Sequence, residues 1–166
     1  MERSGNLPHA QYHRFEGMRE FEERLDEMIP QAQSIIRVFD KTLSREYNSA
    51  RRHEALRQFL LASRSNRLMI VVHEADPIER QCPRVIDLAR QFTTAVKIRQ
   101  TLRPARHVYD PFVIFDATNY LHRFHFEHLR AAQGMNDVIG TQQLLDRFAE
   151  IWEASAPAIS ADKTGL

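Results

Sequence analysis

The chain has 166 residues, of which 43% are hydrophobic and 27% charged, values typical of one globular domain with a hydrophobic core. No apolar run of about 18 residues is present, and the polar N-terminus lacks the apolar stretch of a signal peptide, so we expect a cytoplasmic protein without membrane insertion. Cys82 is the single cysteine, which excludes an internal disulfide and agrees with a reducing compartment.

The net charge of +1 conceals an uneven distribution. Residues 34–133 contain 17 basic and 10 acidic residues, whereas the segments before and after this region each have an excess of three acidic residues. Of the 23 basic residues 20 are arginine, whose planar guanidinium group suits phosphate oxygens. A phosphate-bearing partner is therefore one explanation, and a codon bias that places arginine on solvated surfaces is the other.

The first half of the chain predicts a tail and four elements. Residues 1–14 are polar and lack periodicity, which predicts a loose tail. Helical spacing predicts a helix over 15–29 that stops at a proline, and the β-branched run 34–40 predicts a strand. A capped helix over 48–63 and a strand over 67–74, apolar enough to be buried on both faces, follow.

The second half predicts one more helix, three strands and a closing helix. The helix at 77–92 is interrupted at Pro83, and strands follow at 95–102, 111–116 and 119–126, with the last two forming an antiparallel hairpin. A helix over 138–154 ends the domain at 156, and a second loose tail is expected over 157–166. This order predicts an α/β fold with a mixed, partly parallel β-sheet flanked by helices on both faces.

The positions of glycine exclude several classes of enzyme. No glycine lies between Gly17 and Gly134, yet loops that hold a nucleotide or coenzyme phosphate need glycine where backbone amides approach the phosphate. Nucleotide-dependent kinases, dehydrogenases and acetyltransferases are therefore disfavoured, and no cofactor is expected. A G-x-S-x-G nucleophile motif is also absent.

The stretch HVYDPFVIFDATNYLHRF (107–124), with the closing segment LLDRFAEIWEAS, carries a family resemblance. Over residues 15–156 the layout resembles one repeat of the phospholipase D-like superfamily, of the single-repeat bacterial type, and implies an α/β/α sandwich. The family motif H-x-K-x-x-x-x-D implies a histidine that attacks phosphorus, a lysine that neutralises the phosphate oxygens and an aspartate that supports the site. Single-repeat members dimerise, so the resemblance also implies a homodimer.

The sequence departs from this motif in either alignment. If Asp116 is the family aspartate, Tyr109 takes the histidine position and Pro111 the lysine position. If His107 is the family histidine, Tyr109 takes the lysine position and Ile114 that of the aspartate. The first alignment fits better because Asp116 ends the apolar strand. Neither alignment retains a lysine, so the resemblance implies the fold and argues against the reaction.

Candidate site residues follow from the rule that ligands gather at the carboxyl ends of the strands in an open α/β sheet. If the protein is catalytic, the candidates are His107, Asp116, His122 and His73; for ligand binding they are Arg99, Arg103, Arg106, Asn119 and Arg123. A satisfied core histidine is the competing explanation for His122. A metal site formed by His122, His125 and His128 is disfavoured, because His122 and His125 point to opposite faces of a strand.

Two functions remain open. The preferred hypothesis is a pseudoenzyme that acts as a binding or interaction module, for nucleic acid or another phosphodiester, for a protein partner, or as a homodimer. The alternative is a divergent phosphodiesterase or nuclease with an unconventional histidine and aspartate site. The missing lysine favours the first.

Overall fold

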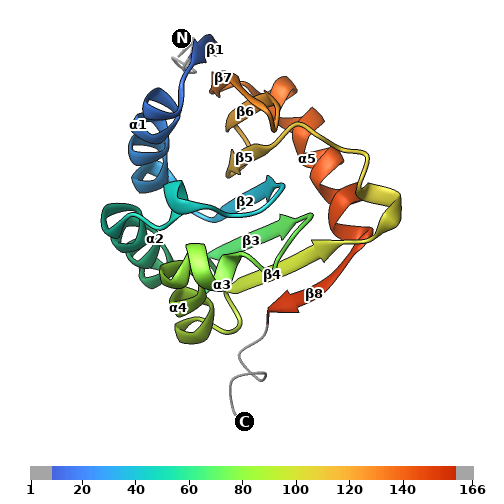
Figure 1. Ribbon diagram of the computed structural model, residues 1–166. Coiled ribbons are helices and arrows are strands. Elements are labelled where there is room, and N and C mark those ends of the chain that lie inside the picture. Colours follow the sequence, from blue (N-terminus) through green and yellow to red (C-terminus); the bar gives the residue numbers. More distant parts are fainter. Residues whose placement is uncertain (1–8, 160–166) are drawn as a thin grey trace.

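One mixed β-sheet forms the centre of the molecule in the computed structural model, which describes residues 9–159 (Figure 1). The strand order is β1-β7-β6-β5-β2-β3-β4-β8. The strands are β1 (Gln11–Glu16), β2 (Ile35–Asp40), β3 (Arg67–Val72), β4 (Val96–Thr101), β5 (Phe112–Phe115), β6 (Asn119–His125), β7 (His128–Met135) and β8 (Ser155–Ile159).

The direction of the strands divides the sheet into a parallel centre and antiparallel flanks. Strands β2, β3 and β4 are parallel, and β5, β6, β7 and β1 continue the sheet in antiparallel pairs on one side. Strand β8 pairs antiparallel with β4 on the other side. The carboxyl ends of β2, β3 and β4 therefore meet at one edge of the sheet.

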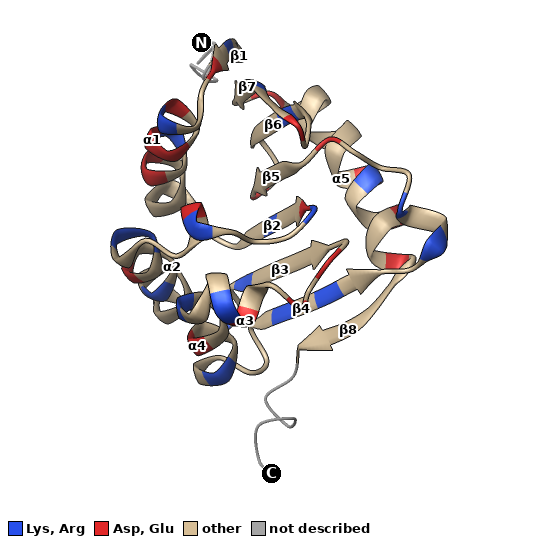
Figure 2. Cartoon of the chain, in the orientation of Figure 1, with Lys and Arg blue, Asp and Glu red and all other residues tan. Residues whose placement is uncertain are grey.

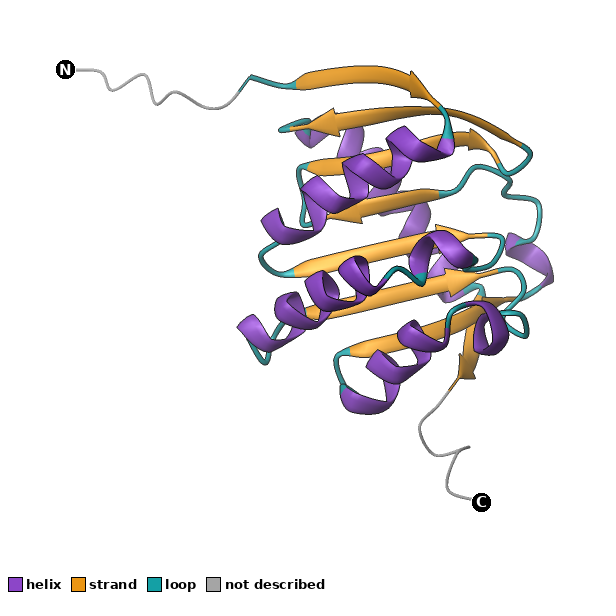
Figure 3. Ribbon diagram, turned by 60° about the vertical axis from the view of Figure 1, so that its left-hand side comes forward, coloured by secondary structure: helices purple, strands orange, loops and turns teal. Residues whose placement is uncertain are grey.

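Helices cover both faces of the sheet (Figure 3). One face carries α1 (Met18–Met28), α2 (Ala50–Ala62), α3 (Ile78–Gln81) and α4 (Pro83–Gln91), and the other carries α5 (Val138–Glu153). Short 3₁₀ turns lie at η1 (Ile29–Gln31), η2 (Arg45–Tyr47) and η3 (Arg103–Ala105). The predicted α/β fold class is confirmed.

The two faces of the sheet bury two separate clusters of apolar side chains. Because side chains alternate along a strand, Ile70 and Val72 of β3 pack beneath the four helices, whereas Val71 packs beneath α5. The continuous apolar runs of β3 and β5 are buried on both sides for this reason. Figure 2 marks many Lys, Arg, Asp and Glu positions on α1 and α2, whereas β5 contains none.

Several predicted helices begin and end close to the expected positions. Helix α2 follows Ser49, whose hydroxyl accepts a hydrogen bond from the backbone N–H of Arg52. The expected interruption at Pro83 separates α3 from α4, and α5 ends one residue before its predicted end. The hairpin of β5 and β6 is also confirmed.

The sequence did not predict three of the strands, and two of these strands lie partly in the segments that were expected to be loose tails. Strand β1 takes in residues 11–14 of the expected N-terminal tail, and β8 takes in residues 157–159 of the expected C-terminal tail. The predicted helix at 15 begins only at Met18. Of β1 only Phe15 is buried, and β8 contains Pro157, so neither edge strand shows a pattern of alternating apolar residues. The other tail residues, 1–8 and 160–166, lie outside the described residues.

Strand β7 was missed for a different reason. Its buried centre consists of Ala131, Ala132, Gln133 and Gly134, which have weak strand propensity. A side chain at Gly134 would collide with the ring of Tyr120 on β6, so the small residues allow that ring to lie across the strand. Among residues 9–159, no helix is long and apolar enough to cross a bilayer.

Candidate ligand-binding cleft

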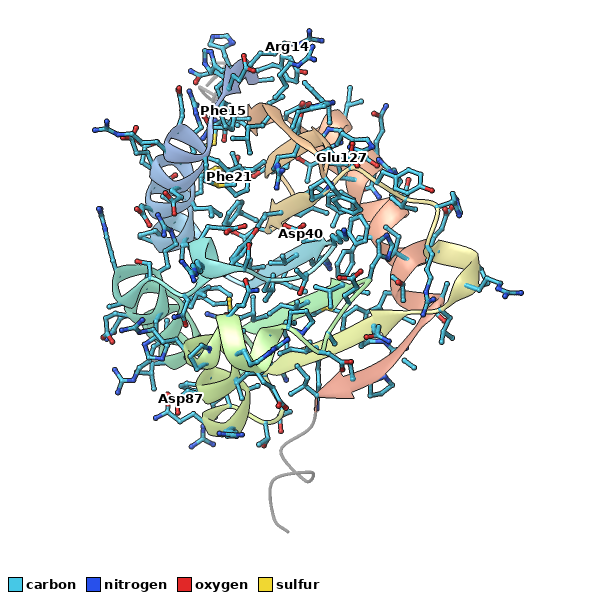
Figure 4. All side chains as sticks on the ribbon, in the orientation of Figure 1. Arg14, Phe15, Phe21, Asp40, Asp87 and Glu127 are labelled. Atoms are coloured by element: carbon cyan, nitrogen blue, oxygen red, sulfur yellow. The ribbon has the colours of Figure 1, made fainter. Side chains whose placement is uncertain are left out.

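A cleft of about 610 Å³ opens at the carboxyl ends of β2, β3 and β4. Its walls come from the residues that follow these strands, from the segment between η3 and β5, and from the turn between β6 and β7. The lining residues are Lys41, His73, Glu74, Ala75, Asp76, Gln100, Arg106, Tyr109, His125, Phe126 and Glu127. Figure 4 labels Glu127 on the turn and Asp40, the last residue of β2.

The cleft combines cations, carboxylates and aromatic rings. Lys41 and Arg106 are exposed cations, and neither forms an ion pair within residues 9–159. The ring of Tyr109 is 54% exposed and stacks on His125, with centroids 5.9 Å apart. Glu74, Asp76 and Glu127 provide negative charge. The cleft can therefore hold an anionic group beside a flat ring, and its carboxylates can accept hydrogen bonds from amino groups.

His73 lies in the wall of the cleft with both ring nitrogens occupied. Its Nε2–H donates to the carbonyl of Val108 at 2.7 Å, which leaves Nδ1 to accept from the Thr101 hydroxyl at 2.6 Å. Burial lowers the pKa of the imidazole, an effect that the bond to Val108 only partly offsets. His73 is therefore a neutral residue that ties the segment before β5 to the ends of β3 and β4.

Asp116 lies at the opposite edge of the sheet, because β5 runs antiparallel to β2. Its carboxylate accepts hydrogen bonds from the backbone amides of Gln33, Ser34 and Ile35 and from the Ser34 hydroxyl. Burial raises the pKa of Asp116, but these hydrogen bonds outweigh burial and hold the pKa below its usual value. Its backbone φ of 57° is one that aspartate tolerates at a turn. Asp116 therefore fastens the start of β2 to the turn between β5 and β6.

His122 belongs to a group of three charged or polar side chains on the α5 side of the sheet. Its Nε2 lies 2.7 Å from Asp110, and the guanidinium group of Arg147 on α5 binds both oxygens of the same carboxylate. Burial raises the pKa of Asp110, but the hydrogen bonds from Arg147 and His122 hold it well below its usual range. This cluster anchors α5 to the segment before β5.

The predicted ligand-binding arginines do not converge on one place. Arg106 lines the cleft, and Arg103 is exposed nearby on η3 but is not part of the lining. Arg99 lies on the face of Trp152 and donates to Ser155. Arg123 is buried and donates to the carbonyls of Phe126 and His128, so it holds the hairpin of β6 and β7 together.

The remaining predicted residues lie outside the cleft. Asn119 accepts a hydrogen bond from the backbone of Asn136 and belongs to the far edge of the sheet. His107 is exposed and lines a neighbouring hollow. Of the candidates named from sequence, only His73 and Arg106 therefore line the cleft.

Sequence reasoning missed Lys41, Gln100, Tyr109 and His125 as cleft residues. Lys41 follows directly on Asp40, which ends a predicted strand, so the rule that identified His73 would also have identified Lys41. Tyr109 was noted only as the residue in the histidine or the lysine position of the family motif. Within residues 9–159, no group of three or more His, Cys, Asp or Glu side chains is arranged to hold a metal ion.

Solved structures share this fold at low sequence identity. The phospholipase D family member Nuc from Salmonella typhimurium aligns with a TM-score of 0.69 and 15% identity over 92% of this chain and 100% of its own. NucT from Helicobacter pylori aligns with a TM-score of 0.61 and 12% identity over 90% of this chain and 100% of its own.

A larger protein contains a similar fold. TrmBL2, described as an archaeal chromatin protein with a novel mode of DNA binding, aligns with a TM-score of 0.66 and 14% identity over 89% of this chain. The match covers 54% of TrmBL2, so this chain spans about half the length of that protein.

Sequence comparison identifies the family without identifying a function. No curated protein matches the sequence of the chain. A family model described as a domain of unknown function (DUF7931) matches residues 10–161, nearly the whole length of the chain. The chain therefore belongs to the DUF7931 family, and its fold is that of the phospholipase D-like proteins.

Proposed function

We propose that this protein is a noncatalytic phospholipase D-like domain that binds a phosphodiester ligand, such as nucleic acid, in the cleft at the carboxyl ends of β2, β3 and β4. One observation carries the proposal: the groups that a hydrolase would need are bonded internally and lie apart from one another. Asp116 is held by backbone amides at the far edge of the sheet, and both ring nitrogens of His73 are occupied. His122 is bound to Asp110.

The lack of a lysine in the position of the phospholipase D-like motif supports the same conclusion. In the better alignment with the family motif, Pro111 stands where the lysine would meet the phosphate, and Pro111 is buried. A covalent phosphoryl intermediate requires both a free nucleophile and charge stabilisation at the phosphate oxygens. The side chains of Tyr109 and Pro111 supply neither a basic imidazole nor a positive charge.

Support for binding comes from two cations that line the cleft and form no ion pair within residues 9–159. Lys41 and Arg106 come from different segments, and the exposed ring of Tyr109 lies in the same cleft. Cations contact phosphate oxygens, and an exposed aromatic ring adds a surface for a flat group. The description of TrmBL2 as a DNA-binding protein makes nucleic acid the first ligand to test.

The test is fluorescence anisotropy with labelled single-stranded and duplex DNA and RNA over a series of salt concentrations. We expect affinity to fall as salt rises, because counterions are released when cations bind phosphates. The double variant Lys41→Ala/Arg106→Ala should lower the slope of log affinity against log salt by about two, roughly one for each lost contact.

The matched control is Arg90→Ala combined with Arg64→Ala, which removes the same charge. Arg64 and Arg90 are both exposed, and both lie near the opposite edge of the sheet, after α2 and at the end of α4. This control should bind like the wild type. Equal losses in both double variants would contradict a site in the cleft, and no binding at low salt would contradict the proposed function itself.

A further inference from the structure

A second hollow adjoins the cleft and shares a wall with it. This hollow has a volume of about 400 Å³ and lies on the α5 side of the segment before β5. Its lining residues are His107, Val108, Tyr109, Asp110, Phe124, His125, Arg147, Glu150 and Ile151. Tyr109 and His125 line both spaces, so their stacked rings form a ridge between the cleft and the hollow.

The ridge is built as a rigid aromatic platform. The rings of Tyr109 and His125 are inclined by only 24°, and the edge of Phe126 supports Tyr109 from one side. The backbone of Tyr109 is also fixed, because its carbonyl accepts a hydrogen bond from the amide of Phe126. An exposed ring that is held this firmly loses little freedom when a second ring stacks on it.

Polar and basic side chains continue past the ridge into the hollow. His107 is exposed at the rim, and the side chain of Arg147 is 37% exposed although it binds Asp110. Beyond the hollow, the guanidinium group of Arg14 on β1 lies 5.6 Å from the centre of the Phe124 ring. Since Asp110 is already paired with Arg147 and His122, Glu150 is the one other carboxylate among the lining residues.

Cations and aromatic rings lie along one path, beside the carboxylates of Glu74, Asp76 and Glu127 in the cleft. Lys41 and Arg106 lie in the cleft, Tyr109 and His125 form the ridge, and Phe124 and Arg14 lie beyond it. Cations and exposed rings together suit a single strand of nucleic acid, in which phosphates and unpaired bases recur along the chain. It does not suit a duplex, because paired bases cannot offer their faces to Tyr109.

We infer that the cleft and the hollow form one continuous track for single-stranded nucleic acid, with a base stacked on Tyr109 at the ridge and the strand continuing toward Arg14. This inference rests on the proposed function, since Lys41 and Arg106 must bind the backbone for a strand to reach the ridge. The inference specifies the class of ligand, the path that the strand takes across the fold, and the minimum length of strand that reaches past the ridge. A dinucleotide fits the cleft alone, whereas a longer strand crosses the ridge.

The test compares labelled single-stranded DNA of two and eight nucleotides with an eight-base-pair duplex. We expect the eight-nucleotide strand to bind more tightly than both other probes. Tyr109→Ala should weaken its binding by roughly 5-fold to 150-fold, the range expected for one stacked base, while Tyr109→Phe should retain it. Arg14→Ala combined with His107→Ala should weaken the eight-nucleotide strand and leave the dinucleotide unchanged.

The outcomes separate this inference from the proposed function. If Lys41→Ala/Arg106→Ala weakens binding but Tyr109→Ala has no effect, or if the duplex binds as tightly as the strand, the track is wrong and binding in the cleft stands. Equal weakening of both strand lengths by Arg14→Ala/His107→Ala would also contradict the track. If none of the three probes binds at low salt, the inference and the proposed function both fail. Thermal unfolding of each variant checks that the fold is retained.

Discussion

The polar side chains at the two ends of β5 differ in whether they have partners within the protein. At the Asp116 end, a carboxylate accepts hydrogen bonds from three consecutive backbone amides and a hydroxyl, so the site is complete without a ligand. At the other end, Asp110 is paired with Arg147 and His122, but Arg106, and Lys41 after the neighbouring β2, line the cleft and form no ion pair within residues 9–159. The contacts of Asp116 serve the fold, because they join the start of β2 to the turn after β5.

This difference distinguishes a residue that stabilises the fold, Asp116, from residues that are available to bind a ligand. A carboxylate that bridges the start of β2 and the turn after β5 is useful whether or not the cleft is catalytic. Tyr109 differs, because its exposed side chain lines the cleft. The presence of Asp116 at the end of β5 therefore gives no support for hydrolysis.

The largest expected effect comes from removing the hydrogen bonds of Asp116 at the end of β5. Asp116→Ala should lower the free energy of unfolding by about 3 kcal/mol, because it removes the hydrogen bonds to the carboxylate and places alanine at a positive φ. The loss of stability is not expected to be larger, because the carboxylate is partly exposed and water can replace some of its hydrogen bonds. Urea unfolding measures the change.

Asp116→Asn is the matched control for this substitution. Asparagine tolerates the same backbone conformation and retains one acceptor oxygen, so it should cost about half as much. Binding to the cleft should be unchanged in both variants. If Asp116→Ala lowers the free energy of unfolding by less than about 0.5 kcal/mol, as an ordinary surface substitution does, the hydrogen bonds of Asp116 contribute little to stability.

The next effect concerns Asp40, which ends β2 on the cleft side and is buried. Burial raises its pKa to about 7, although Arg123 and the amide of Lys41 oppose the shift. Because the folded state holds this proton more tightly than the unfolded state, stability should fall as pH rises from about 4 to 7. Asp40→Asn should remove this dependence and stabilise the protein at pH 8 by roughly 2 kcal/mol.

Urea unfolding at pH 5 and pH 8 measures the contribution of Asp40. The wild type should lose more stability than Asp40→Asn between these values. If both proteins show the same difference, the carboxylate of Asp40 does not titrate in this range and the sign of the shift is wrong.

A smaller effect is expected at Asp110, beside the hollow. Its pKa is lowered in the folded state, so the stability it provides is present above the ordinary aspartate pKa of about 4 and is lost as pH falls further. Asp110→Asn should lessen this acid loss by roughly 1 to 2 kcal/mol, discounted because the cluster is partly exposed. Thermal unfolding from pH 5 to pH 2 measures it, with Asp146→Asn as an exposed control; an equally steep acid loss in Asp110→Asn would contradict it.

Patterns along the chain were sufficient for the centre of the fold but not for its margins. The apolar runs that form β3 and β5 are buried on both faces, and such runs are recognisable without any partner. Strands β1, β7 and β8 depend on pairing with neighbouring strands instead. Phe15 is the one buried residue of β1, and in β7 a residue larger than Gly134 would collide with the ring of Tyr120. Tertiary contacts, not local preference, make these segments strands.

The site was predictable only where it depends on strand ends. The carboxyl-end rule located His73 and the neighbourhood of Arg106, because it follows from topology alone. It could not reveal that Arg147 binds Asp110 across 37 positions of sequence, or that Arg99 turns toward Trp152. Such pairings arise when helices pack on the sheet, and no local spacing encodes them.

The most direct test of the central claim measures binding and cleavage in one sample. End-labelled single-stranded DNA of eight nucleotides is held with saturating protein at low salt, its anisotropy is recorded, and its length is then analysed on a gel. We predict a bound and intact strand, with binding reduced in Lys41→Ala/Arg106→Ala. Shortened products from the wild type that disappear in His107→Ala/His122→Ala would contradict a noncatalytic domain, and an unbound strand would contradict a binding cleft.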